Sequence, residues 1–278
     1  MSNFWKINIL FRRISNKLFI QYLKFRKLLL SPSPSQKILF SDSKPDWRKD
    51  ITKGFKNSRH TIDFNAITSE NIKGYDLLVP LTVQDLENKE IQKLLLNNPI
   101  PIPSVESVLL CDDKYLFNKA LISGGFEKFI PKMGESKTFP YILKKKVDQF
   151  GVNTHIIHGP PEEADYSEQL QSHEYFTQEI IGGRYEYATH VVFRKGRIVN
   201  SLNIKYTFIG ELSIKGKDES VKTICRCPYL KVFASMLETI GFEGLCCFNY
   251  KVRDNIPHII EINPRFGSSL TPYFSLFV

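Results

Sequence analysis

The sequence predicts an α/β protein in which a small parallel α/β domain precedes a larger domain rich in antiparallel strands. Short apolar segments that alternate with helical or irregular segments predict the first domain. Long alternating segments joined by tight polar turns predict the antiparallel strands of the second. The chain has 278 residues, 42% of them hydrophobic and 24% charged, which is typical of a globular protein with room for one large or two small domains.

The positive charge is concentrated in residues 1–35, which hold seven basic residues and no acid, against a formal net charge of +9 for the whole chain. Apolar residues at steps of three and four over 4–29 predict a basic amphipathic helix, and the serines and prolines of 31–35 predict a linker. This helix has two interpretations: adsorption to an anionic membrane surface, or docking on its own domain or on a partner subunit. An organelle transit peptide would have a similar pattern. Because the rest of the chain is close to neutral, we expect no nucleic-acid binding.

Residues 36–110 are expected to form the small α/β domain. Strands are predicted at 37–40, 60–64 and 75–81, with helical or irregular segments between them. The segment Ile100-Pro101-Ile102-Pro103 is extended and stiffened by its prolines. We place the domain boundary just after it, near Leu110.

Residues 111–278 are expected to form the larger domain. Helices are predicted at 111–125, 160–171 and 229–240. Strands are predicted at 140–146, 154–157, 175–181, 185–194, 197–206, 245–252 and 258–262. The last two form an antiparallel pair, as do 185–194 and 197–206 around a Lys-Gly turn.

The five cysteines predict reduced thiols in a cytoplasmic protein. Their number is odd, and the spacings Cys225/Cys227 and Cys246/Cys247 are too tight for a simple disulfide framework. They also lack the C-x2-C spacing of a zinc site, and adjacent cysteines on a strand point to opposite faces, so small buried side chains are the favoured interpretation. No segment approaches the roughly 20 apolar residues of a membrane span.

The chemistry-bearing residues gather on the last pair of strands. Asn249 and Glu261 lie near the ends of adjacent strands, and a period of two places Asn263 on the same face as Glu261. Carboxylate and amide oxygens on one face can hold a hard cation such as Mg²⁺. Arg265 follows with a planar, permanently charged group suited to phosphate. A metal site beside an arginine is what phosphoryl transfer requires.

With residues upstream in matching order, this pattern resembles the ATP-grasp superfamily, the carboxylate–amine and carboxylate–thiol ligases and their relatives. The resemblance covers roughly residues 110–270 and implies a two-lobed ATP-grasp domain with antiparallel sheets, preceded by the small α/β domain. It implies that Lys114 and Lys144 bind the nucleotide phosphates under a flexible loop at Gly151. The backbone of Glu179, Ile180 and Ile181 would hold adenine, and Glu186 would bind the ribose hydroxyls.

The resemblance further implies an enzyme that uses ATP with Mg²⁺, or with Mn²⁺ in its place. The expected reaction activates a small-molecule carboxylate as an acyl phosphate, which an amine or thiol then attacks. Asn249, Glu261 and Asn263 would be the metal ligands, and Arg265 and Lys144 the catalytic residues. Lys205 and Lys215 are interpreted as surface lysines on a loop, although either could reach the γ-phosphate.

Three departures from the family pattern favour an alternative function. Asn249 stands where an acid is commoner, the segment 147–158 has a single glycine, and few residues follow Arg265. They fit a degenerate, non-catalytic ATP-binding module, which the basic N-terminal helix would associate with the membrane surface.

Overall fold

The computed structural model describes residues 18, 21, 22, 34–134, 138–148 and 151–278. The basic helix expected at 4–29 therefore lies outside the described residues except at Leu18, Gln21 and Tyr22, which are helical and exposed. Both interpretations of this segment stay predictions. Among the described helices, none is long and apolar enough to cross a membrane.

A three-stranded parallel sheet forms the first part of the described chain, as predicted. Its strand order is β2-β1-β3, with β1 (Lys37–Phe40) in the centre, β2 (Thr61–Phe64) and β3 (Leu77–Val79). The helices around it are α2 (Arg48–Phe55), α3 (Val83–Glu87) and α4 (Lys89–Leu94). Because β1 is paired on both sides, Ile38, Leu39 and Phe40 are completely buried.

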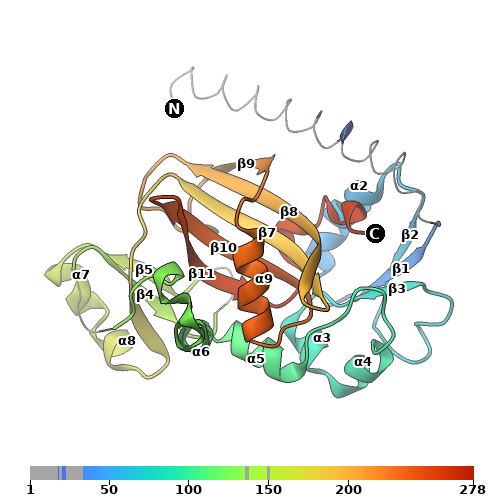
Figure 1. Ribbon diagram of the computed structural model, residues 1–278, viewed down its shortest axis with the longest axis horizontal. Coiled ribbons are helices and arrows are strands. Elements are labelled where there is room, and N and C mark those ends of the chain that lie inside the picture. Colours follow the sequence, from blue (N-terminus) through green and yellow to red (C-terminus); the bar gives the residue numbers. More distant parts are fainter. Residues whose placement is uncertain (1–17, 19–20, 23–33, 135–137, 149–150) are drawn as a thin grey trace.

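A smaller antiparallel sheet lies at the left of Figure 1, away from the parallel sheet. Its order is β5-β4-β6, formed by β4 (Tyr141–Lys145), β5 (Thr154–Ile157) and β6 (Tyr175–Glu179). The neighbouring helices are α5 (Val105–Asp112), α6 (Lys114–Leu121), α7 (Pro160–Asp165) and α8 (Ser167–Gln171). This sheet and its helices form the first lobe of the larger domain.

A five-stranded antiparallel sheet forms the second lobe, in the order β11-β10-β7-β8-β9. Its strands are β7 (Tyr185–Arg194), β8 (Arg197–Phe208), β9 (Ser220–Cys225), β10 (Gly244–Arg253) and β11 (Ile256–Asn263). Helix α9 (Leu230–Thr239) covers one face, where Phe233 stacks on Phe248 with ring centroids 4.3 Å apart (Figure 1). On the other face, Phe40 of the parallel sheet meets Phe266 and Phe274 at centroid distances of 6.1 and 5.6 Å, so one apolar core joins the two parts.

Two predicted helices and one strand differ from the structure. The helix expected at 111–125 begins earlier and is split, because Asp113 leaves the helical conformation and its carboxylate accepts hydrogen bonds from the backbone of Tyr115 and Leu116, starting α6 anew. The helix expected at 160–171 is divided at Tyr166. The sequence analysis did not predict β9.

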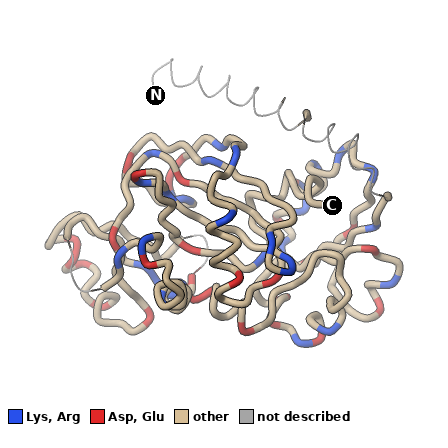
Figure 2. Tube along the Cα trace, in the orientation of Figure 1, with Lys and Arg blue, Asp and Glu red and all other residues tan. Residues whose placement is uncertain are grey.

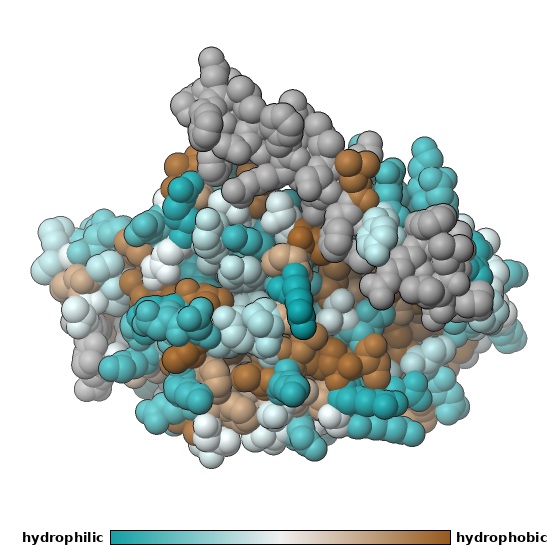
Figure 3. Space-filling model, turned by 45° about the horizontal axis from the view of Figure 1, so that its top comes forward, coloured by the Kyte–Doolittle hydropathy of each residue, from teal (hydrophilic) through white to brown (hydrophobic). Residues whose placement is uncertain are grey.

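Charged residues of both signs are scattered over the described chain rather than gathered on one face (Figure 2). On the face shown in Figure 3, hydrophobic residues are likewise interspersed with hydrophilic ones.

Candidate functional site

A cavity with both charged and apolar lining lies between the two antiparallel sheets. The sequence-predicted residues that line it are Lys114, Lys144, Gly151, Glu179, Ile180, Ile181, Glu186 and Glu261. They come from α6, β4, β6, β7, β11 and the loop before β5, so the fold brings together residues more than a hundred positions apart. The free volume is about 100 Å³. That is below the ~300 Å³ usual for ligand pockets.

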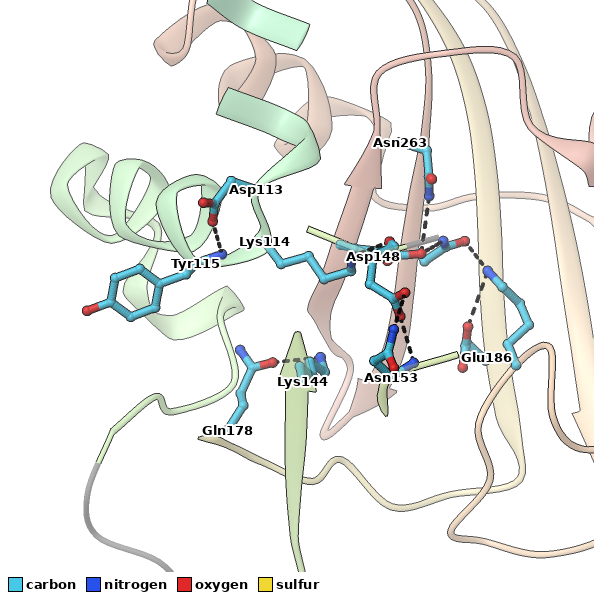
Figure 4. Close-up of polar contacts among 12 residues, drawn as sticks. Asp113, Lys114, Tyr115, Lys144, Asp148, Asn153, Gln178, Glu186 and Asn263 are labelled. Atoms are coloured by element: carbon cyan, nitrogen blue, oxygen red, sulfur yellow. Dashed lines mark hydrogen bonds and ion pairs between the residues drawn. The ribbon is translucent and has the colours of Figure 1, made fainter. Parts of the chain in front are cut away.

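Two buried lysines approach the cavity from the first lobe (Figure 4). The ammonium of Lys114 donates to the carbonyl oxygen of Asp148 at 2.6 Å and lies 3.7 Å from Oε2 of Glu261. Lys144 is 4% exposed and donates to Oε1 of Gln178 at 2.8 Å. Burial lowers the pKa of Lys144 to about 8, although Glu261 opposes that change.

Lys144 is the one of three consecutive lysines that lines the cavity. Lys144 turns into the cavity, whereas Lys145 projects from the other face of β4 and pairs with Glu174 at 3.0 Å. Lys146 lies over the ring of Tyr115 at 4.8 Å. Of the three, only Lys144 can face a ligand in the cavity.

The carboxylate of Glu261 is held between two amides. Asn249 sits directly opposite on β10, and its Nδ2 donates to Oε1 of Glu261 at 2.6 Å. Nδ2 of Asn263 donates to the same oxygen at 3.2 Å. Burial would raise the pKa of Glu261, but Lys114, Lys215 and the two amides outweigh it and lower the pKa to about 2. Glu261 is therefore ionised at neutral pH.

This donor set fits Mg²⁺ that is already bound to phosphate. It consists of hard oxygens, but it contains a single carboxylate, and no described group of three His, Cys, Asp or Glu residues could hold a metal ion. Four lysines also line the cavity: Lys114, Lys144, Lys215 and Lys251. Mg²⁺ is commonly bound by one or two carboxylates together with substrate phosphates, and this arrangement matches that pattern.

Glu186 lies on the second lobe, buried at 4% exposure. Burial raises its pKa, while Lys215 and Lys251 act in the opposite direction. The ammonium of Lys215 is 3.4 Å from Oε1 of Glu186, and it also contacts Oδ1 of Asn249. Burial would lower the pKa of Lys215, but Glu186 and other groups raise it overall. The interpretation of Lys215 as a surface lysine is wrong, whereas Lys205 lies over the ring of Tyr185 at 3.5 Å and does not line the cavity.

The segment proposed for adenine follows directly from the small sheet. β6 ends at Glu179, so the backbone of Ile180 and Ile181 continues along the cavity beyond the last strand pairing. The side chain of Glu179 accepts from Nη1 of Arg253 at 2.5 Å, which ties this segment to the end of β10. Nε2 of Gln178 donates to the carbonyl oxygen of Pro131 at 3.0 Å.

The backbone of Gly151, which lines the cavity, has a conformation that favours glycine. Its φ is +66°, and a Cβ there would meet Cγ2 of Ile214 at 3.4 Å and the carbonyl oxygen of Lys215 at 3.6 Å. The loop before β5 and the loop between β8 and β9 therefore approach each other closely over the cavity.

Three predicted residues do not line the cavity themselves. Asn249 and Asn263 reach it through their hydrogen bonds to Glu261. Arg265 is buried, and its Nη1 donates to the carbonyl oxygen of Phe266 at 3.0 Å. Arg265 lines a separate apolar cavity. Its positive charge acts to lower the pKa of Asp112, against the larger effect of burial, which raises it.

The sequence did not lead us to Lys251 as a cavity residue, and it led us to undervalue Lys215. Lys251 could have been predicted, because it follows Asn249 by two positions on the same strand and so shares its face. In the structure its ammonium donates to the carbonyl oxygen of Gly183 at 3.3 Å. Lys215 carries no such signal, since it lies in a loop.

No protein-family model matches the sequence, and no curated protein matches it significantly. The structure is similar to D-alanine–D-alanine ligase from Bacillus anthracis, with a TM-score of 0.59 and 16% identity, covering 87% of this chain and 95% of that one. It is also similar to phosphoribosylamine–glycine ligase from Thermotoga maritima, with a TM-score of 0.60, 15% identity and coverage of 85% and 70%. An L-amino acid ligase from Bacillus licheniformis matches with a TM-score of 0.57, 12% identity and coverage of 87% and 69%.

These structures have the ATP-grasp fold, so the fold expected from the sequence is confirmed. At such low identities the likeness establishes the fold and leaves the reaction to be argued from the residues.

Proposed function

We propose that this chain, which has the ATP-grasp fold, is an ATP-dependent ligase that activates a carboxylate as an acyl phosphate for attack by an amine or thiol. One observation carries the proposal: the ionised Glu261 sits between Lys114 and Lys215 in a cavity that also holds the buried Lys144. Lys144 and Lys251 donate to neutral oxygens rather than to a carboxylate. Buried positive charge of this kind destabilises a folded protein, so its presence here favours a polyanionic ligand. The names of the similar structures, all three ligases, support the same class of reaction.

Each part of the nucleotide has a proposed contact. Lys114 and Lys144 would neutralise the β- and γ-phosphates. Glu186 would accept hydrogen bonds from the ribose hydroxyls. The backbone of Glu179, Ile180 and Ile181 would hold adenine through main-chain hydrogen bonds, and Gly151 would let its loop approach the phosphates closely.

Glu261 and Asn263 would hold Mg²⁺, or Mn²⁺, with the phosphates, and Asn249 is the third ligand expected from sequence. When bound, the metal ion neutralises charge on the phosphate oxygens. The hydrogen bonds from the two amides fix the orientation of the Glu261 carboxylate, and the low pKa keeps it ionised for that role.

The proposed reaction has two steps. An oxygen of the substrate carboxylate attacks the γ-phosphorus, the bond to the bridging oxygen of ADP breaks, and the electron pair leaves on ADP. Lys114 and Lys144 would stabilise this charge. The amine or thiol then attacks the acyl carbon, inorganic phosphate leaves, and the nucleophile loses its proton. Arg265 would contribute positive charge from beside Glu261.

The test combines Mg-ATP calorimetry with ADP release over a panel of carboxylates and amines. We expect Mg-ATP to bind and ADP release to require a carboxylate. Glu261→Gln should abolish ADP release with the fold intact, whereas Glu238→Gln, an exposed residue of α9, should not change it. ADP release that persists in Glu261→Gln would refute the metal-ligand assignment.

The alternative, a non-catalytic ATP-binding module, is favoured by one observation. Asn249 is neutral where an acid is expected, and its oxygen already contacts the ammonium of Lys215. Tight Mg-ATP binding without ADP release for any carboxylate would select this alternative.

A further inference from the structure

Lys215 is held in a small cage at one end of the cavity. Its ammonium contacts Oδ1 of Asn249, lies 3.4 Å from Oε1 of Glu186 and is 5.3 Å from the centroid of the Tyr206 ring. The contact with Glu186 is the dashed line that ends on this residue in Figure 4. An amide oxygen, a carboxylate and an aromatic face are the groups that hold a cation.

The loop that carries Lys215 is fixed to both lobes. Within the loop, the backbone nitrogen of Ile214 donates to Oδ2 of Asp218 at 2.6 Å. The ammonium of Lys217 donates to the carbonyl oxygen of Thr154 in the first lobe at 2.7 Å. At the start of the loop, the carbonyl oxygen of Glu211 accepts from the backbone of Gly183 at 3.0 Å. The position of Lys215 is therefore set by the backbone as well as by its own contacts.

Both polar atoms of the Asn249 side chain are already engaged. Nδ2 donates to Glu261 and cannot ligate a metal, while Oδ1 faces the ammonium of Lys215. A divalent ion on Oδ1 would stand a few ångströms from that ammonium, and like charges at such a distance repel strongly in a buried site. The carboxylate of Glu261 is also approached by an ammonium, that of Lys114 at 3.7 Å from Oε2. Unlike the neutral amide of Asn249, however, Glu261 carries a negative charge that attracts a divalent ion.

We propose that the ammonium of Lys215 takes the place of a metal ion at Asn249, so that the site binds the nucleotide with one divalent ion rather than two. The divalent ion would be bound by Glu261 and Asn263. The ammonium of Lys215 would bind the phosphate oxygens from the side of the cavity nearest Asn249. Asn249 suits this arrangement because a neutral amide accepts from an ammonium without adding a charge that would recruit a second metal. The inference rests on the proposed nucleotide site and revises the role that the sequence assigned to Asn249.

Counting bound metal tests the inference without relying on activity. The protein is titrated with Mn²⁺ in the presence of a non-hydrolysable ATP analogue, and free Mn²⁺ is measured by electron paramagnetic resonance. We expect one Mn²⁺ per nucleotide complex for the wild type, and two for the double variant Lys215→Met with Asn249→Asp. Asn249→Asp alone should still bind one, because the ammonium pairs with the new carboxylate. Lys205→Met, at a lysine that lies over Tyr185 and does not line the cavity, is the matched control and should also bind one.

A second measurement uses the nucleotide analogue in excess chelator. A permanent ammonium predicts that the wild type keeps measurable affinity without metal, and that Lys215→Met loses about tenfold of it. Lys215→Arg, which keeps the charge, should retain most of the affinity. Thermal unfolding of each variant checks folding, and the wild-type metal count is informative whatever the variants do.

Two Mn²⁺ per wild-type complex would overturn the inference and leave the proposed function standing. Equal metal-free affinity of wild type and Lys215→Met would overturn it as well. Failure of the wild type to bind nucleotide in excess Mg²⁺ would instead refute the proposed function and, with it, this inference.

Discussion

Two cavities meet at the stretch from Glu261 to Phe266, and they are opposite in character. The proposed nucleotide cavity is lined by four lysines and by Glu179, Glu186 and Glu261. The second cavity lies between the parallel sheet and the turn after β11, and Asn98 and Arg265 are the polar side chains in an otherwise apolar lining that includes Leu78, Leu245 and Phe274. The segment from Glu261 to Phe266 thus borders one cavity that contains many charged side chains and a second cavity that is lined mainly by apolar ones.

The difference separates function from stability. Buried charges destabilise a fold unless they are paired, so the lysines of the first cavity are expected to be retained for a ligand. Apolar contacts in the second cavity stabilise the junction between the parallel sheet and the large sheet. Substitutions in the two cavities should therefore affect different measurements.

The largest effect on stability is expected at the apolar junction. Phe274 is completely buried, and its ring lies 5.0 Å from that of Phe266 and 5.6 Å from that of Phe40. Phe274→Ala should lower the free energy of unfolding by about 3–5 kcal/mol, measured by urea denaturation. The nucleotide affinity of the folded fraction should not change. Leu116→Ala, at a side chain that is 50% exposed, should change stability by about 0.5 kcal/mol or less. A loss of nucleotide affinity in folded Phe274→Ala would break the distinction between the cavities.

The opposite pattern is expected at Lys144. Lys144→Met should weaken Mg-ATP binding by about tenfold to a hundredfold, because a buried charge-assisted contact to phosphate is lost. Stability should stay the same or rise, because burial disfavours the charged lysine in the free protein. The matched control is Lys145→Met, which alters the neighbouring lysine on the other face of β4 and should leave Mg-ATP affinity unchanged. Calorimetry and thermal unfolding of both variants measure the two effects, and equal affinities would refute the phosphate assignment.

The smallest effect is a proton uptake that accompanies nucleotide binding. The pKa of Lys144 is lowered to about 8 in the free protein, and a bound phosphate should raise it again. Above pH 8 binding should therefore take up a proton, and affinity should fall as pH rises. Below that pH Lys144 is already charged and should take up none. Titrations at about pH 9 in buffers of different ionisation enthalpy measure this uptake. Its absence in the wild type, or its persistence in Lys144→Met, would contradict the role of Lys144.

Much of the arrangement of the candidate site could be predicted from the sequence because its residues lie on regular strands. A period of two places Glu261 and Asn263 on one face, and the same rule separates Lys144 from Lys145 and would have found Lys251. The rule ends with the strand. β11 stops at Asn263, and Pro264 turns the chain, so Arg265 points to the apolar cavity rather than continuing the alternation.

Residues in loops and at helix breaks could not be placed from the sequence. Lys215 reaches Asn249 from the loop between β8 and β9, and nothing in a local pattern specifies that distance. Asp113 interrupts the helix expected at 111–125, because its side chain accepts hydrogen bonds from the backbone at the start of α6. Aspartate can make such bonds outside a helix as readily as it can occupy a helix interior, so the sequence does not decide between the two. Both features depend on contacts that form only in the folded chain.

The most direct test of the proposed ligase is to trap the acyl phosphate. The protein is incubated with Mg-ATP, hydroxylamine and each member of a panel of small carboxylates, and hydroxamate is measured together with ADP. We predict ATP-dependent hydroxamate formation with at least one carboxylate, in equal amount to ADP, and none with Glu261→Gln. Binding of Mg-ATP without hydroxamate or ADP for any carboxylate in the panel would contradict the account.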